Sequence, residues 1–259
     1  MKLLNLAKRI FYILIWFVIV FYPLGLSAQI VNIENQRLQN KKEGWIVESD
    51  LNFLLMKNLS MIMQFGNRNK LNYKKEQHSL LLMTDANLIK INTSNYINSG
   101  FAHVRYSYNL HKFQKIYYES FLQSQYNRVQ FLKSRNLLGI GARFEIVKLD
   151  SFAINAGTFV MGEYEVQTDE KINQTARYSC FLSFDYQFNK STGINSITYY
   201  QPDFLFPADF RISSETSLRL QMTKKISFKV IYNLYFDTFP PQGIPTTFYY
   251  LSNSVSLRF

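Results

Sequence analysis

Apolar and polar residues alternate along most of the chain, from about residue 44 to the last residue. A period of two places successive side chains on opposite faces of an extended strand, whereas an amphipathic helix needs a period near 3.6. The alternation is clearest over residues 178–188 and 226–236, weak over 192–201, and interrupted by Asn67 and Asn69. We therefore predict an all-β chain of twelve strands, near residues 45–56, 59–73, 77–91, 97–110, 115–127, 134–147, 151–165, 175–188, 192–201, 209–222, 225–237 and 249–259.

The last stretch of the chain, YYLSNSVSLRF, reads as an amphipathic strand that stops on an aromatic residue. One of its faces carries Tyr249, Leu251, Val255, Leu257 and Phe259. An apolar edge strand at the end of a soluble protein invites aggregation, whereas a closed barrel removes that edge by pairing the last strand with the first. The ending resembles the C-terminal insertion signal of bacterial outer-membrane β-barrels. The alternative is the terminal strand of a soluble sandwich.

The connections between the predicted strands favour the barrel over the sandwich. One alternate set is short and polar, at 74–76, around Lys112, and at 148–150, 189–191 and 223–225. The other set is mostly longer, at 92–97, 128–133, 167–173, 202–208 and 238–246. Short periplasmic turns alternating with longer external loops are typical of membrane barrels, and the predicted strands are long enough to cross a bilayer. We predict a single 12-stranded antiparallel transmembrane β-barrel over residues 44–259, with both termini in the periplasm.

Residues 1–28 have the pattern of a secretory signal peptide. Lys2, Lys8 and Arg9 precede an apolar run over 10–22, and the small residue Ala28 marks the expected cleavage site. The run is short for a membrane helix, which needs about 20 apolar residues, so an uncleaved anchor is the alternative. Residues 29–43 are polar and without periodicity, and we expect a periplasmic lead-in there.

Composition removes several classes of function. The formal net charge is +11, and loss of the three basic residues of the signal peptide leaves 26 Lys and Arg against 18 Asp and Glu, or +8. These basic residues are scattered, so we expect no nucleic-acid binding. Cys180 is the only cysteine, which excludes a disulfide framework. Because the sequence shows no metal-ligand spacing and no Gly-rich phosphate loop, we expect no cofactor.

The polar faces of the predicted strands carry charges of both signs. These charges should face the lumen, because Arg or Lys on the lipid side costs about 2–4 kcal/mol at mid-membrane. Mixed signs favour mutual ion pairs, whereas a selectivity constriction, the alternative, would favour a ring of one sign. The predicted lumenal network consists of His103, Arg105, Glu119, Gln123, Arg135, Arg143, Glu145, Glu163, Arg177, Asp185, Arg211, Glu215 and Arg219.

Two further expectations concern the contents of the lumen. Phe121, Phe159 and Phe181 fall on the inward face, where their rings would take up volume. Arg143 has Glu119 and Glu145 as its expected carboxylate partners. Such a lumen should obstruct the bore of a twelve-stranded barrel, whose size lies between filled barrels of about eight strands and open porins of 16–18.

Catalysis finds little support in the sequence. Among the candidate bases His78, His103 and His111, only His103 lies inside a well-patterned strand, beside Arg105 on the lumenal face. The chain lacks the His-x-Ser-Asn-Gly arrangement of outer-membrane phospholipases, and no set of His, Ser and acid can be placed within hydrogen-bond reach. We therefore expect no enzyme, with an outer-membrane lipid hydrolase or acyltransferase as the alternative.

Three stretches of the chain resemble a known family: LNFLLMKNLSMIMQFGNRNKLNYKKEQHSLLL, YYESFLQSQYNRVQFLKSRNLLGIGARFEIV and TYYQPDF. The chain resembles the salt-induced outer-membrane proteins, a domain of unknown function, mainly over residues 44–165. The resemblance implies an outer-membrane barrel and supplies no reaction or ligand.

The barrel interpretation sets the expected partners and role. We expect contact with outer-membrane lipid and lipopolysaccharide, and with the barrel-assembly machinery during biogenesis, by a monomer. The expected role is a narrow or partly filled channel or an envelope-integrity protein. A receptor or subunit that binds a partner through external loops is a further alternative.

Overall fold

A computed structural model describes residues 43–57, 61–91, 94–110, 115–240 and 244–259. The predicted signal peptide and lead-in, together with His111 and Lys112, lie outside these residues. None of the helices in the described ranges is long and apolar enough to cross a membrane. The strands are β1 (Gly44–Lys57), β2 (Met61–Lys75), β3 (His78–Ile91), β4 (Ser94–Asn109), β5 (Ile116–Asn127), β6 (Leu132–Lys148), β7 (Phe152–Gln167), β8 (Ile172–Gln187), β9 (Thr192–Pro202), β10 (Phe210–Gln221), β11 (Ile226–Asp237) and β12 (Thr247–Arg258), with a 3-10 turn, η2 (Arg128–Gln130), before β6.

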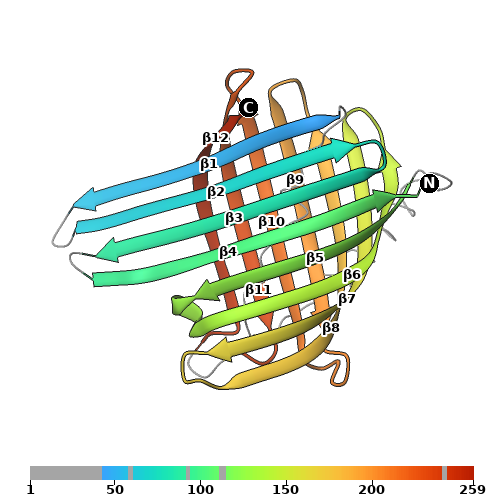
Figure 1. The fold of residues 1–259 in the computed structure, drawn as a ribbon. Helices are drawn as coiled ribbons and strands as arrows, with labels where there is room; N and C mark the ends of the chain where they lie inside the picture. Colours follow the sequence, from blue (N-terminus) through green and yellow to red (C-terminus); the bar gives the residue numbers. More distant parts are fainter. Residues whose placement is uncertain (1–42, 58–60, 92–93, 111–114, 241–243) are drawn as a thin grey trace, which may run out of the picture.

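The strands close into one antiparallel barrel in which each strand pairs with its neighbours in sequence, as predicted (Figure 1). Closure comes from β1 and β12, which are antiparallel, with Glu48 opposite Arg258. Strand β1 therefore begins at the rim where β12 ends. We call this the terminal rim, and we call the opposite one, where β1 ends, the distal rim.

The barrel is apolar outside and polar inside. Trp45, Leu122, Ile140 and Leu251 are each at least 58% exposed on the outer face, whereas the inner face buries most of the charged residues of the strands. Water-soluble barrels show the reverse distribution. An apolar outer band around a charged interior is what a lipid bilayer requires, since charges facing lipid are costly and interior charges can pair.

Strand β2 departs from this distribution on its outer face. Asn67 and Asn69 point outward, which explains why the alternation of the sequence fails there. Ser49 Oγ donates to Asn69 Oδ1 over 2.8 Å, and Asn69 Nδ2 donates to Thr84 Oγ1 over 3.4 Å. These polar groups on β1, β2 and β3 satisfy one another, which reduces the cost of facing lipid.

The sequence makes Lys57–Asn58 a short exception in the longer set, and this connection is short in the structure, but the expected long connection at 92–97 is wrong. At the distal rim, β1 ends at Lys57 and β2 begins at Met61, and β3 ends at Ile91 and β4 begins at Ser94. Only 203–209 and 238–246 are long connections there. Polar side chains do not end a strand whose backbone groups still have partners across the ladder, and a register shift at Lys90 lets β4 pair from Ser94 onward.

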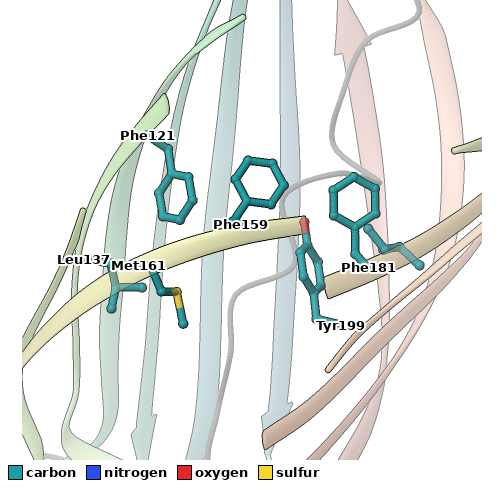
Figure 2. Packing of buried hydrophobic residues seen from close by; sticks show 7 residues of the cluster. Phe121, Leu137, Phe159, Met161, Phe181 and Tyr199 are labelled. Carbon is teal, nitrogen blue, oxygen red and sulfur yellow. The ribbon is translucent and has the colours of Figure 1, made fainter. Parts of the chain in front are cut away.

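Aromatic side chains fill one side of the interior. Phe121, Phe159 and Phe181 form a cluster with Leu137, Met161, Ile197 and Tyr199 on the inner face of β5–β9 (Figure 2). Each phenylalanine is directly opposite a glycine on the next strand: Phe121 opposite Gly139, Phe159 opposite Gly141, and Phe181 opposite Gly157. A Cβ at any of these glycines would collide with the facing ring. The glycines therefore let the rings lie flat along the wall instead of standing across the bore.

Candidate functional site

The largest group of buried charges lies inside the barrel near the distal rim. Glu163 on β7 is at its centre. Arg211 Nη1 donates to Glu163 Oε1 over 2.7 Å, and Arg177 Nε and Arg135 Nε each lie 3.6 Å from its carboxylate. Strand β10, which carries Arg211, is separated from β7 by β8 and β9. The Arg211–Glu163 pair therefore connects two walls of the barrel instead of adjacent strands.

Further carboxylates complete this distal cluster. Arg135 Nη2 lies 2.6 Å from Glu165 Oε2, and Arg211 Nε lies 2.8 Å from Asp237 Oδ2. Arg177 donates from both terminal nitrogens to Asp209, over 3.0 and 2.9 Å. Bidentate and bridging arginines of this kind are the strongest neutralisers of carboxylates in proteins. Each guanidinium in the cluster has at least one carboxylate partner, which makes the cluster a structural network.

The loop over 203–209 covers part of the distal cluster. Asp203 accepts hydrogen bonds from the amides of Leu205 and Phe206, over 2.8 and 2.9 Å, and from the hydroxyl of Thr175. Burial opposes ionisation of Asp203, but these hydrogen bonds outweigh it and hold the pKa of its carboxyl below the ordinary value. The ionised carboxylate thus stabilises the turn that begins the loop.

A second ion-pair group lies nearer the terminal rim, on β4–β6. Arg105 Nη1 lies 3.2 Å from Glu119 Oε2, and Arg143 Nε lies 3.0 Å from Glu119 Oε1. The guanidinium of Arg143 also stacks on Tyr117, 3.7 Å from the ring centroid. Two arginines therefore share one carboxylate, and Arg105 is in addition 5.5 Å from the rings of Phe121 and Phe159.

A third group joins β1 to β2 and to β11, across the closure of the barrel. Lys70 Nζ on β2 lies 2.8 Å from Glu48 and 3.0 Å from Asp50, and Lys229 Nζ lies 2.6 and 3.0 Å from the same carboxylates. Glu48 and Asp50 belong to β1, whereas Lys229 belongs to β11. Lys229 therefore reaches past β12 and holds together the strands on both sides of the closure.

One arginine links strands on the two sides of the β1–β12 closure. Arg68 Nε on β2 lies 2.6 Å from Asp85 Oδ2 on β3, and Arg68 Nη1 lies 3.5 Å from Glu215 Oε2 on β10. Strands β1, β12 and β11 separate β2 from β10 in the barrel. The contact therefore links non-adjacent strands through the interior, as the Arg211–Glu163 pair does nearer the distal rim.

The structure brings most of the predicted network residues into these groups and leaves others apart. His103 is fully buried, 3.1 Å from Gln123 Oε1 and stacked on Phe121. Arg219 donates to Gln187 over 2.9 Å near the terminal rim, where Asp185 also lies. That all of these residues act as one lumenal network stays a prediction.

Of the two carboxylates expected beside Arg143, Glu119 pairs with it, whereas Glu145 pairs with Lys148. Glu145 accepts from Lys148 over 2.7 Å, at the terminal end of β6. The register of β6 against β7 shifts between Glu145 and Val147, so Glu145 lies on an irregular strand end beside the rim. Arg143 instead pairs with Glu119 and donates to Asn155 over 3.2 Å.

Among the residues that the predicted network lacked, Arg68 and Lys70 of β2 are central. Both lie on the inward face of β2, two residues apart, between Gly66 and Asn72. The polar outward residues Asn67 and Asn69 make both faces of this strand polar, so alternation gives no inward set. The apolar residues Met61, Met63 and Phe65 could have identified Arg68 and Lys70. They place the odd-numbered positions of β2 on the outer face, and if this alternation continues, the even-numbered positions 68 and 70 face inward.

Comparison with known proteins places the chain in a family. The model of the family described as "Protein of unknown function, DUF481" matches residues 39–256. The chain belongs to this family. Its description does not mention salt, and a salt-induced role stays a prediction. No curated protein sequence matches the chain.

Several solved structures are similar to this member of the DUF481 family. The NanC porin shares 9% identity with a TM-score of 0.47 over 82% of this chain and 97% of that one. The KdgM porin shares 11% identity with a TM-score of 0.42 over 83% and 98%. The translocator domain of the autotransporter NalP from Neisseria meningitidis shares 8% identity with a TM-score of 0.49 over 86% and 90%. What these proteins carry or bind says nothing about this chain.

The DUF481 chain is an outer-membrane β-barrel protein. Its barrel is closed and antiparallel, with an even number of strands. Its outer face is apolar and its charged side chains point inward. Together these features are the architecture of bacterial outer-membrane barrels, which avoid open sheet edges in lipid by closing.

Proposed function

We propose that this protein is a narrow, largely filled barrel that passes water and small ions at most, and serves as a restricted channel or an envelope-integrity protein. The observation that carries the proposal is the pair of arginines that cross the interior, Arg68 to Glu215 and Arg211 to Glu163. Both acceptor carboxylates are at most 4% exposed. A general porin keeps this central space for water.

The aromatic wall supports the same function. Phe159, Phe181 and Tyr199 are 3–5% exposed although they line the interior. Burial to this degree requires neighbours on the lumenal side as well as within the wall (Figure 2). Twelve strands leave a bore intermediate between filled and open barrels, so the volume of the contents decides passage.

The charges of the lumen favour weak selectivity. In each of the three ion-pair groups, carboxylates alternate with arginines or lysines at 2.6–3.6 Å. A ring of one sign, which would select strongly for counter-ions, is absent from the described part of the lumen. A residual current should therefore discriminate little between small cations and anions.

We also propose that the barrel does not hydrolyse or transfer lipid. The candidate base His103 is 0% exposed and stacked on Phe121 at a centroid distance of 5.4 Å. A lipid ester could not reach its ring from the bilayer. Purified protein should show no phospholipase or acyltransferase turnover, and turnover that disappears in His103→Ala would establish the enzyme alternative.

Liposome swelling tests the restricted lumen. Proteoliposomes diluted into iso-osmotic sucrose should not swell, and those in arabinose should swell slowly or not at all. A double variant, Arg68→Ala with Arg211→Ala, removes both crossing side chains and should admit arabinose. Lys148→Ala, which removes a lysine 59% exposed at the rim, is the control and should change nothing. Rapid swelling of the unmodified protein in sucrose would refute the proposal.

A further inference from the structure

The barrel wall is incomplete between its first and last strands. Strands β1 and β12 share four register pairs, from Glu48–Arg258 to Leu51–Val255, and backbone bonds between Val47 and Phe259 extend them by one position. Every other neighbouring pair of strands is in register over eight to fifteen positions. Beyond Leu51, the described residues of β1 have no register partner on β12. We call this unpaired part the seam.

The seam begins within the apolar band of the outer face. Phe53 on β1 is 66% exposed and Leu251 on β12 is 67% exposed, on either side of it. Figure 1 shows the arrow end of β1 directed away from β12. Unpaired backbone in contact with lipid is unfavourable, because lipid offers no hydrogen bonds. A molecule that lies in the seam and offers polar groups would relieve this cost.

A cavity of about 380 Å³ lies directly behind the seam. Its walls include inward-facing residues of β1, β2 and β12, and also Asn67 and Leu251, which point outward. Residues of β3, β4, β5 and β11 line it as well, so the cavity lies in the lumen beside the seam, with Leu251 where it meets the seam. Its volume is within the range of about 300–1,000 Å³ that is usual for small-molecule sites.

Polar atoms in this cavity lack partners. Asn52 Oδ1 and Ser254 Oγ are buried without a hydrogen bond, and Ser254 is only 6% exposed. The last register pair between β1 and β12 is Leu51–Val255. If the two strands stayed paired beyond it, Asn52 and Ser254 would be the next residues opposite each other, because the two numbers of each pair add up to 306. A buried polar group without a partner is unfavourable by about 1–3 kcal/mol. Both atoms therefore mark a place for a ligand.

At the floor of the cavity the side-chain amides of Asn52 and Asn87 pack against Gly66. A Cβ on Gly66 would collide with the side-chain amides of Asn52 and Asn87. Glycine at this position of β2 allows both side chains to lie against the strand. Tyr250 and Ser252 on β12 contribute hydroxyl groups from the opposite side.

The chemistry of the cavity favours an uncharged ligand. Its charged residues already have partners: Asp85 pairs with Arg68 over 2.6 Å, and Asp50 pairs with Lys70 and Lys229, each over 3.0 Å. Arg68 Nη1 is also buried without a hydrogen bond and can donate one to an uncharged oxygen, and the other polar groups are amides and hydroxyls, which both donate and accept. Hydroxyl groups of a ligand can serve both, since each also donates and accepts.

We propose that the cavity binds the uncharged, hydroxyl-rich head group of a membrane amphiphile, a glycosyl head group by its chemistry, whose acyl chains pass through the seam into the bilayer. The head group donates to Asn52 Oδ1 and bonds Ser254 Oγ. Apolar side chains beside the seam, Phe53 and Leu251, contact the acyl chains. Arg68 belongs both to this cavity and to the restricted lumen, but lipid retention and solute passage are measured separately, so either proposal can fail without the other.

Native mass spectrometry from nanodiscs tests the site. The bilayer is phosphatidylcholine containing a monoglucosyl diacylglycerol with the same acyl chains. The unmodified protein should retain one glycolipid in preference to phosphatidylcholine. Asn52→Leu, similar in volume, should weaken retention by about tenfold, as expected for one buried hydrogen bond. The control is Asn195→Leu, which changes another inward asparagine with a buried, unpaired Oδ1 outside the cavity, and it should retain the lipid.

Closing the seam provides a second readout that does not alter the cavity. Phe53 and Asn253, whose numbers also sum to 306, are outward-facing positions beyond the last formed pair. In a Cys180→Ser background, a disulfide between Phe53→Cys and Asn253→Cys should abolish glycolipid retention, and reduction should restore it. The control pair is Ser49→Cys with Leu257→Cys, residues already opposite each other. It should leave retention unchanged.

Several results would overturn the proposal. The first is that the protein retains phosphatidylcholine as well as it retains the glycolipid. The second is that Asn52→Leu and Asn195→Leu weaken glycolipid retention equally. The third is that the Phe53→Cys/Asn253→Cys disulfide leaves glycolipid retention unchanged. Displacement of the glycolipid by methyl glucoside would place a soluble sugar in the cavity instead of a lipid. A dimer that disappears when the seam is closed would place a second copy there. If Asn52→Leu fails to fold, the disulfide pair decides.

Discussion

The wall formed by β5–β9 and the closure between β1 and β12 are built in contrasting ways. Within the wall, β6 and β7 are in register over fifteen positions, and three phenylalanines lie over glycines of the adjacent strands. At the closure, only four register pairs form and Lys229 reaches across to Glu48 and Asp50. The wall is stabilised along its whole length, whereas the closure depends on a few contacts near the terminal rim.

The comparison shows that a barrel with a packed interior can have a less tightly packed region, here the closure between β1 and β12. Buried ion pairs and packed rings make the β5–β9 side rigid, because removing any member leaves a buried charge or a void. The closure has no such packing beyond Leu51, and its cavity contains polar groups without partners. We therefore expect changes to the closure to affect assembly and binding, and changes to the wall to affect stability and conductance.

Deletion of Phe259 should have the largest effect. Phe259 exchanges backbone hydrogen bonds with Val47 over 2.9 and 3.3 Å, one of the few connections at the closure, and it is the last residue of the expected insertion signal. Cells expressing the truncated chain should contain little folded protein in the outer membrane, measured by fractionation and heat-dependent gel mobility. Normal assembly would show that neither the contact nor the signal is needed.

Removal of Glu163 should strongly destabilise the distal cluster. Glu163→Ala removes the carboxylate that Arg211, Arg177 and Arg135 share and leaves each with fewer partners, which should lower the free energy of unfolding by about 3–5 kcal/mol. Glu145→Ala breaks a pair with a lysine that is 59% exposed and should cost less than about 1 kcal/mol. Urea unfolding in lipid vesicles measures both. Equal effects would contradict a rigid distal cluster.

Two glycines of β7 offer a matched test of the aromatic wall. Gly157→Ala places a Cβ against the ring of Phe181 and should destabilise the barrel by about 1–3 kcal/mol. Gly162→Ala adds a methyl group on the outward face, where nothing lies within 4 Å, and should be neutral or slightly stabilising. Similar unfolding midpoints for the two variants would mean that the rings are not closely packed.

Arg143→Ala should change ion selectivity more than stability. Glu119 would retain Arg105 but lose the second guanidinium, 3.0 Å away, so the local charge becomes more negative. The reversal potential of any residual current should shift toward cation preference. Lys148→Ala, at the rim, should not shift it. A shift toward anions in Arg143→Ala would contradict the pairing.

The smallest effect concerns pH and the loop over 203–209. Because the folded pKa of Asp203 is lowered, its ionised form stabilises the loop above the unfolded value of about 3.9. This stabilisation is lost as the pH falls through the folded pKa. Hydrogen exchange at the amides of Leu205 and Phe206 should be slow at pH 5 and accelerate in strong acid. In Asp203→Ala, exchange should be fast at both pH values.

The sequence predicts the architecture well because the pattern that encodes it is local. Each strand in a membrane barrel meets lipid on one face and the lumen on the other, so alternation reveals both its existence and its phase. All twelve strands were placed within a few residues of their positions. The main error, at the connection expected over 92–97, arose because polar residues such as Asn95 and Asn98 suggest loops but continue β4.

The contacts across the interior could not be predicted in the same way. Which walls meet depends on the stagger of the strands and the shape of the barrel, so Arg68 reaching Glu215 has no signature along the chain. The closure is also non-local, because its register relates the first strand to the last. A single register shift near Glu145 was enough to misassign one ion pair.

Single-channel recording in planar lipid bilayers tests the filled lumen most directly. With Arg68 and Arg211 bridging the walls and phenylalanines covering one side, the unmodified protein should show small or flickering conductance. The current should show little preference between small cations and anions. A large, steady and unselective conductance would contradict the account and make this protein a general porin.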